Sequence, residues 1–208
     1  MTSDLFVTGT DTNVGKTLLS ALLVASLDRR YWKPIQTGTK EGTDREAVMK
    51  WAGVSADRTH PEAYRFEHPV APQFAAELSG VTIDLARIQR PVTDEPLIIE
   101  GAGGVLAPIS DDALMLDLME RLGTPVVIAS RTALGTINHT LLTITLLRET
   151  RLEVRGVVMI GKDNPDNRRA IEGHGKVPVI GSIPPLEALD RSTLRSVFDR
   201  HFDARAFE

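Results

Sequence analysis

Short apolar runs alternate along the chain with longer segments in which apolar residues recur every three to four positions. The apolar runs, each bounded by Gly, Pro or Asp, predict strands at residues 4–9, 31–36, 96–101, 125–130, 154–161 and 178–183. The longer segments predict helices at 15–28, 44–52, 72–79, 82–89, 112–122, 136–150, 165–173 and 191–201. This alternation is typical of parallel strands joined by crossover helices.

We therefore expect a doubly wound α/β fold, a mainly parallel sheet with helices on both faces. Several predicted strands are apolar throughout, as strands buried on both faces are. The chain contains no internal repeat, low-complexity tract or linker, so we expect a single domain over residues 1–208. In such a fold, ligands bind beyond the carboxyl ends of the strands.

Composition narrows the class of protein. A hydrophobic share of 42% in 208 residues supplies the core of one domain. The absence of cysteine excludes disulfides, thiolate metal sites and a cysteine nucleophile. A net charge of -4 predicts no general attraction to nucleic acid or to an anionic membrane. Because the N-terminal segment lacks the basic region of a secretory signal and no apolar run reaches about 18 residues, we expect a soluble cytoplasmic protein.

The clearest chemical motif is "GTDTNVGKT" at residues 9–17, between the first predicted strand and an apolar helix. It ends in Gly15, Lys16 and Thr17 as a phosphate-binding loop does, although Gly9 lies one residue too early for the spacing G-x-x-x-x-G-K-[ST]. A helix N-terminus here would direct backbone N–H groups at an anion, Lys16 would add charge, and Thr17 a hydroxyl for Mg²⁺. The segment predicts a nucleotide phosphate site.

Four polar residues lie within or after other predicted strands. Lys33 precedes Pro34 and should lie in extended chain, where a lysine is most often solvated; Thr37 could cap local backbone. Asp44 is near a helix start, where an acid is favoured whatever its function. Glu100 is harder to explain structurally, because it ends an apolar strand and precedes three glycines that permit close approach of a ligand.

A second helix N-terminus follows the predicted strand at 125–130. Gly135 and Thr136 could open this helix and form an anion site suited to a carboxylate. His139, one turn further on, is interpreted as a packing or hydrogen-bonding residue. The remaining histidines share no metal-ligand spacing.

Together these segments resemble the dethiobiotin synthetases, a P-loop family of the biotin pathway. The resemblance rests on "FVTGTDTNVGKT" at 6–17, "WKPIQTG" at 32–38, Asp44, "APQFAAE" at 71–77, "IEGAGG" at 99–104, "LGTINHT" at 134–140, "GVVMIG" at 156–161 and "GSIPPL" at 181–186. In that family the phosphate loop carries the same extra residue. The resemblance implies a ligase that converts 7,8-diaminopelargonic acid, CO₂ and ATP, with Mg²⁺, into dethiobiotin, ADP and phosphate through a carbamate and a mixed anhydride.

The resemblance also assigns residues to the site. Lys16 and Lys33 would be catalytic, and Thr17, Asp44 and Glu100 would hold Mg²⁺. Nucleotide contacts would come from Thr12, Asn13, Val14, Gly15, Lys16, Thr17, Leu18, Asp44, Glu100, Gly101, Ala102, Gly103, Ile160, Gly161, Pro184, Pro185 and Leu186. Substrate contacts would come from Thr10, Lys33, Thr37, Leu134, Gly135, Thr136, Ile137 and Asn138. The last five would serve the partner subunit's substrate, which implies a homodimer.

The chain departs from the family at two positions. Asn13 stands where an acid is common, so any role of that charge is absent. Ile160 stands where the family often has an asparagine that reads the adenine edge. An apolar side chain neither donates to nor accepts from a base, so we expect weaker discrimination among nucleoside triphosphates.

The alternative is a regulatory P-loop ATPase of the partitioning or septum-placement kind. Those proteins carry a second lysine early in the loop, where this chain has Thr10 or Asp11. A signalling GTPase would need N-K-x-D, which "IGKD" at 160–163 does not match. Cobalamin amidoligases with a glutaminase cysteine are excluded by the absence of that residue.

Overall fold

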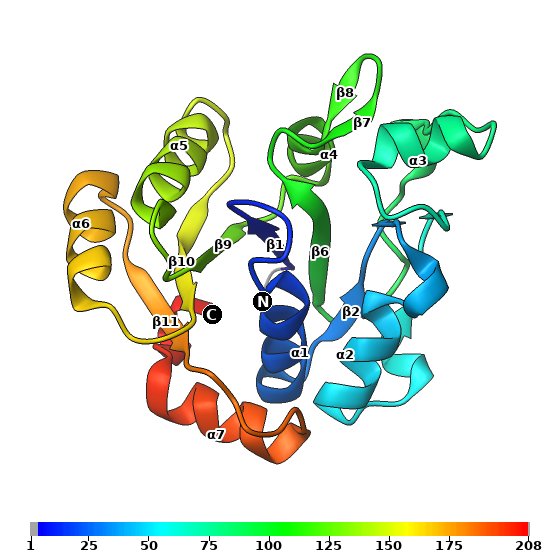
Figure 1. Ribbon diagram of the computed structural model, residues 1–208. Coiled ribbons are helices and arrows are strands. Elements are labelled where there is room, and N and C mark those ends of the chain that lie inside the picture. Colours follow the sequence, from blue (N-terminus) through cyan, green and yellow to red (C-terminus); the bar gives the residue numbers. More distant parts are fainter. Residues whose placement is uncertain (1–3, 208) are drawn as a thin grey trace.

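A seven-stranded sheet forms the centre of the computed structural model, which describes residues 4–207; positions 1–3 and 208 of the predicted domain lie outside the described residues. The strand order is β11-β10-β9-β1-β6-β2-β4 and every recorded pairing is parallel (Figure 1). The strands are β1 (Leu5–Gly9), β2 (Arg30–Trp32), β4 (Thr59–His60), β6 (Leu97–Gly104), β9 (Val126–Arg131), β10 (Val154–Ile160) and β11 (Val179–Ile183).

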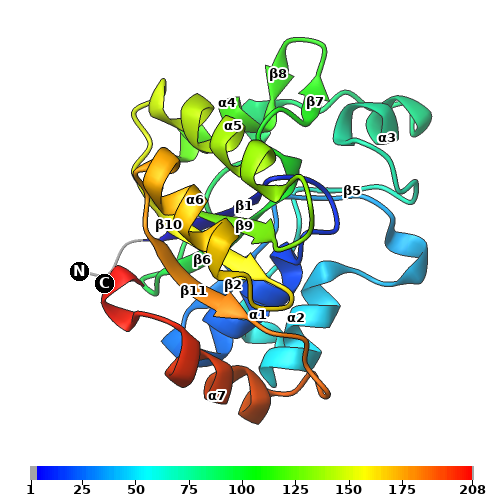
Figure 2. The ribbon, with the colours of Figure 1, turned by 60° about the vertical axis from the view of Figure 1, so that its left-hand side comes forward.

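Helices cover both faces of this sheet (Figures 1 and 2). One face packs against α1 (Lys16–Leu27), α2 (Asp44–Ala52) and α7 (Arg191–His201). The other packs against α3 (Pro72–Leu78), α4 (Met115–Leu122), α5 (Thr136–Arg148) and α6 (Pro165–Gly175). Each face has its own hydrophobic cluster, which confirms the predicted doubly wound α/β fold.

Helix α1 is apolar on nearly all sides because it is the central helix of its layer, between α2 and α7. Its N-terminus follows β1 directly. Gly15, with φ +97°, makes the left-handed turn into the helix, and Asp28 ends it in the left-handed region. The first turn of α1 is therefore held at the carboxyl end of β1.

The strand predicted at 31–36 is divided in two. β2 ends at Trp32, and β3 (Ile35–Gln36) pairs with β5 (Tyr64–Arg65) in a separate two-stranded sheet. Pro34 has no N–H to donate to a neighbouring strand, and its carbonyl instead accepts from the backbone of residues 63 and 64. Lys33 consequently lies at the break between the two sheets.

The helix predicted at 82–89 is wrong: only a 3-10 turn, η3 (Leu85–Arg87), forms there. Ile83 and Ile88 are both buried, but a spacing of five positions does not place them on one helical face. The helix predicted at 112–122 starts later, at Met115, because β7 (Pro108–Ser110) and β8 (Ala113–Leu114) form a hairpin before it. The remaining short elements are η1 (Thr39–Glu41), η2 (Ala56–Arg58) and η4 (Ala204–Phe207).

Within residues 4–207, no helix combines the length and the apolar character that crossing a bilayer requires.

Candidate functional site

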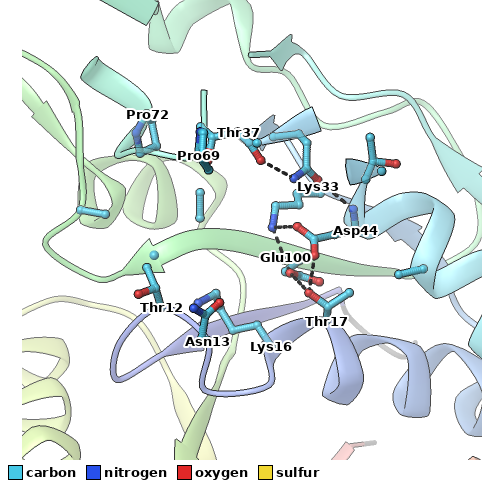
Figure 3. A pocket seen from close by; sticks show the side chains of 18 of the residues that line it. Thr12, Asn13, Lys16, Thr17, Lys33, Thr37, Asp44, Pro69, Pro72 and Glu100 are labelled. Atoms are coloured by element: carbon cyan, nitrogen blue, oxygen red, sulfur yellow. Dashed lines mark hydrogen bonds and ion pairs between the residues drawn. The ribbon is translucent and has the colours of Figure 1, made fainter. Parts of the chain in front are cut away.

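A cavity of about 1250 Å³ opens at the carboxyl ends of β1 and β6, where the sheet order changes direction. Four segments line it: the loop between β1 and α1 with the first turn of α1, residues from Lys33 to Trp51, residues 69–72, and residues 100–108 at and after the end of β6. Figure 3 shows polar side chains from the first, second and fourth of these segments, among them Thr17, Asp44 and Glu100, pointing toward one another. The predicted site residues among its lining are Thr12, Asn13, Gly15, Lys16, Thr17, Leu18, Lys33, Thr37, Asp44, Glu100, Ala102 and Gly103.

Two carboxylates, one hydroxyl and one ammonium group meet in this cavity. Oγ1 of Thr17 lies 2.6 Å from Oδ1 of Asp44 and 2.9 Å from Oε1 of Glu100. Nζ of Lys33 donates to Oδ2 of Asp44 at 2.5 Å and to Oε1 of Glu100 at 3.0 Å. The structure thus brings together the three oxygen groups that were predicted to hold a cation and places a lysine among them (Figure 3).

Burial and the neighbouring carboxylates have opposite effects on the pKa of Lys33. Lys33 is only 5% exposed, so the interpretation of a solvated lysine is wrong. Burial alone would lower its pKa, but the carboxylates of Glu100 and Asp44 outweigh burial and raise it. Burial likewise opposes ionisation of Asp44, and Lys33 reverses this effect, so that the pKa of Asp44 is lowered. The cluster is a compensated group of buried charges.

Asp44 is not the cap of its helix. Thr43 caps α2 through a capping box with Glu46, whose carboxylate accepts from the backbone N–H of Thr43. Asp44 is the first helical residue, and its backbone N–H donates to Oε1 of Gln36. The helix end is therefore satisfied without the Asp44 side chain, which faces the cavity.

The loop before α1 has the geometry of an anion cradle. Among the described residues, the backbone N–H groups from Asn13 to Leu18 donate to no protein acceptor, whereas that of Thr12 donates to Oδ1 of Asp11. Nζ of Lys16 donates to the carbonyl of Asp11 at 3.0 Å, and burial lowers the pKa of this lysine to about 8. Asn13 has φ +56°, a left-handed conformation that asparagine adopts more readily than most residues.

The other predicted nucleotide residues do not line the cavity. Val14 is buried in the core, and a side chain at Gly101 would meet Phe6 on the far side of β6. Ile160 covers the loop instead, because its side chain packs directly over Gly15. The N–H of Gly161 donates to the carbonyl of Ile183, so the ends of β10 and β11 are joined. The segment after β11 contains the remaining predicted contacts Pro184, Pro185 and Leu186.

The start of α5 is fixed by buried hydroxyl groups. Oγ of Ser130 lies 2.7 Å from the hydroxyls of both Thr136 and Thr140, and the Thr136 hydroxyl also donates to the carbonyl of Arg131. The backbone N–H of Thr136 donates to Ala133. Thr136 therefore holds the helix in place and is itself not free for a ligand. The predicted residues Leu134, Gly135, Ile137 and Asn138 do not line the main cavity.

A second cavity, of about 570 Å³, lies between the loop before α1, residues 104–107 and α5. It contains Thr10, which was predicted as a substrate contact. His139 also lines it and is exposed, so of the two interpretations, a packing or a hydrogen-bonding histidine, the packing one is wrong. Leu106 and Leu142 expose 56% and 60% of their surface beside this cavity.

The residues that sequence reasoning missed are Tyr31, Gln36 and the 69–72 segment. The hydroxyl of Tyr31 donates to Oε2 of Glu100 at 3.0 Å. This contact depends on the lateral pairing of β2 with β6, which leaves no local signal in the sequence. The motif "APQFAAE" drew attention to the region of 69–72 without assigning a residue there.

Comparisons with known proteins decide the family. A family model described as an AAA domain matches residues 3–193. The ATP-dependent dethiobiotin synthetase BioD of Paramagnetospirillum magneticum is 52% identical over 189 residues, which cover 91% of each chain. The protein of the same name from Rhodopseudomonas palustris (strain HaA2) is 44% identical and covers 100% of this chain and 97% of its own. The chain belongs to the dethiobiotin synthetase family. It is accordingly an ATP-dependent ligase that forms C–N bonds.

The chain shares its fold with proteins of another class. A ParA family ATPase from Chlorobium tepidum TLS superposes with a TM-score of 0.57 at 13% identity, covering 95% of this chain and 91% of its own. At that identity the likeness shows the P-loop fold alone. The partitioning ATPases are thus neighbours in structure, whereas the close sequence relatives are synthetases.

Proposed function

We propose that this chain catalyses the ATP- and Mg²⁺-dependent closure of 7,8-diaminopelargonic acid and CO₂ to dethiobiotin. The buried cluster of Lys33, Asp44, Glu100 and Thr17 carries the proposal, because it adjoins the phosphate loop in one cavity. The volume of that cavity, about 1250 Å³, accommodates a nucleotide and a second small molecule. The described fold and the close relatives along the whole chain support one catalytic domain.

The reaction forms two C–N bonds at the expense of one phosphoanhydride. One amine adds to CO₂ and loses a proton, giving a carbamate. A carbamate oxygen attacks the γ-phosphorus of ATP, and the bond to the departing ADP oxygen breaks. The second amine then attacks the carbamate carbon and loses a proton, the C–O bond to phosphate breaks, and the cyclic urea and phosphate are released. Two anions must approach each other, so positive charge placed in advance is the main requirement.

The residues supply that charge from two sides. Lys16 and the free N–H groups of residues 13–18 would bind the phosphates of ATP. Lys33, fixed between Asp44 and Glu100, would face the carbamate as it approaches the γ-phosphate. Thr37 lines the same cavity and would position the diamine through its hydroxyl. Positioning of this kind accounts for most of the rate in phosphoryl transfer.

The residues also fit Mg²⁺. Thr17, Asp44 and Glu100 would hold it, since the Thr17 hydroxyl lies 2.6 Å from an oxygen of Asp44 and 2.9 Å from an oxygen of Glu100. Mg²⁺ is commonly bound by one or two carboxylates together with substrate phosphates, and residues 4–207 contain no larger cluster of acids or histidines that could hold a metal alone. When bound, Mg²⁺ would neutralise phosphate charge. The ammonium group of Lys33 also balances the negative charge of Asp44 and Glu100.

The base would lie near the ends of β10 and β11. Ile160 lies against Gly15 of the loop there, and the N–H of Gly161 is joined to Ile183, which precedes the 184–186 segment. Shape and backbone groups would hold the base, without an amide to read its edge.

The enzyme would act as a homodimer. Leu106, Leu142 and the fully exposed Leu134 present apolar surface around α5 and the second cavity. The N–H groups of Ile137 and Asn138 at the start of α5 would receive the carboxylate of a substrate bound in the partner subunit. Thr10, which lines the second cavity, would then lie at the interface.

The deciding experiment measures phosphate release and dethiobiotin formation with Mg²⁺, ATP and bicarbonate, with and without the diamine. Release that requires the diamine and matches dethiobiotin one to one supports the proposal. Release that ignores the diamine would support a regulatory ATPase instead. The Lys33→Ala variant should lose only the diamine-dependent part.

A further inference from the structure

The carboxylate of Glu100 is bound from two opposite directions. Its Oε1 faces the cavity, within 3.0 Å of both Thr17 and Lys33. Its Oε2 faces away and accepts from the hydroxyl of Tyr31 at 3.0 Å; no other donor to Oε2 is recorded among residues 4–207. Glu100 is 1% exposed, so solvent does not replace that donor.

Strand pairing explains why Tyr31 reaches Glu100. Tyr31 on β2 is paired with Ile98 on β6, and Glu100 follows two residues later on the same face of the sheet. The tyrosine ring extends along this face, packed among the apolar side chains under α1 and α2, and its hydroxyl ends at the carboxylate. Tyr31 is fully buried and does not line the cavity, so any effect on the reaction passes through Glu100.

We propose that Tyr31 is a positioning residue whose hydroxyl fixes the Glu100 carboxylate with Oε1 toward Mg²⁺, and that it thereby sets the affinity of the enzyme for the metal. This rests on the proposed function, in which Glu100 holds Mg²⁺. Without the hydroxyl, Oε2 has no donor and the carboxylate is free to rotate away from Thr17 and Lys33. Groups that orient a metal ligand in this way change metal affinity by about 10–100-fold when removed.

The test compares Tyr31→Phe with wild type by electron paramagnetic resonance, using Mn²⁺ in place of Mg²⁺ and a non-hydrolysable ATP analogue. We expect the Kd for Mn²⁺ to rise about tenfold, with kcat at saturating Mg²⁺ close to wild type. The matched control is Tyr64→Phe, because the chain has two tyrosines and Tyr64 bonds the backbone of Asp84 instead. Its Kd for Mn²⁺ should equal that of wild type.

A second measurement leaves Tyr31 in place. Tyr64→Phe protein labelled with 3-fluorotyrosine has one fluorine probe, at Tyr31, and its resonance should shift when Mg²⁺ joins the complex with the ATP analogue. An unchanged Kd in Tyr31→Phe, or an unshifted resonance, would overturn the proposal for Tyr31. Failure of wild type to make dethiobiotin would instead overturn the proposed function.

Discussion

The ammonium group of Lys33 lies 3.0 Å from Oε1 of Glu100, and both side chains are almost completely buried. Lys33 follows the carboxyl end of β2, and Glu100 lies on the neighbouring strand β6. Asp44 is the third charged residue of this cluster. An ammonium group in this position neutralises the carboxylates that the proposed function assigns to a metal. Under the proposed function Lys33 would thereby have two roles, one in stability and one in catalysis, and they can be measured separately.

The Lys33→Met variant should lose stability because it leaves the buried carboxylate of Glu100 and the half-buried one of Asp44 without their cation. Loss of one partner of a buried pair costs about 3–5 kcal/mol. Mg²⁺ should restore part of this loss, since it would replace the missing charge between Asp44 and Glu100. Thermal unfolding of wild type and variant, with and without Mg²⁺, checks both statements.

The control for this prediction is Lys40→Met, which removes an exposed ion pair with Glu67. Its Tm should stay near that of wild type and should not depend on Mg²⁺ more than wild type does. Equal losses in the two variants would show that Lys33 has no special electrostatic role.

His60 should make the stability of the protein pH-dependent. Burial, followed by repulsion from nearby arginines, lowers the pKa of His60 from its ordinary value of 6.5. Below pH 6.5 the unfolded chain takes up a proton that the folded chain resists, so the His60 contribution is present above this pH and is lost as pH falls. Urea unfolding from pH 7.5 down to 5 should show a shallower decline for His60→Gln than for wild type. Parallel declines would contradict the prediction.

Base selectivity should be weak. Because the apolar Ile160, packed on Gly15, stands where the family often has an asparagine, values of kcat/KM for ATP, CTP and GTP should lie within about tenfold of one another. The Ile160→Asn variant should increase the preference for ATP. A wild-type preference for ATP of several orders of magnitude would rule this prediction out.

The hydroxyl of Thr136 should affect binding of the diamine and not of ATP. Thr136→Val breaks the contact with Ser130 that fixes the start of α5, which would raise the KM for the diamine about tenfold and leave the KM for ATP unchanged. Thr143→Val is the control, because its hydroxyl bonds the carbonyl of His139 within the same helix. Steady-state kinetics for both substrates distinguish the variants, and an equal change in both KM values would argue against the role of Thr136.

The apolar surface around α5 should be the dimer interface. Leu142→Glu places a charge on this surface and should convert the dimer to a monomer in sedimentation velocity measurements. Leu78→Glu is the control, since Leu78 on α3 is equally exposed, at 62% against 60% for Leu142. A wild-type monomer, or a Leu142→Glu dimer, would contradict the proposed interface.

Local patterns predicted most elements of the sheet and its helices. The apolar runs at 125–130, 154–161 and 178–183 became β9, β10 and β11, because runs of this kind are buried wherever a parallel sheet forms. The helix predicted at 82–89 does not form. Apolar residues of this segment are buried against other parts of the chain, so their burial does not require a helix. Strands of two or three residues, such as β4 and β8, are too short to show a period.

The phosphate loop, the order of the elements and the prominence of Glu100 could be predicted from the amino-acid sequence, because they depend on neighbouring residues and on the burial of a charge. The contacts of Glu100 could not be predicted in this way, because they depend on how the chain folds. Its partners Lys33 and Tyr31 are 67 and 69 residues away along the chain, and they meet it because β2 pairs with β6 rather than with β1. Strand order arises from the packing of helices on both faces, and no local pattern encodes it.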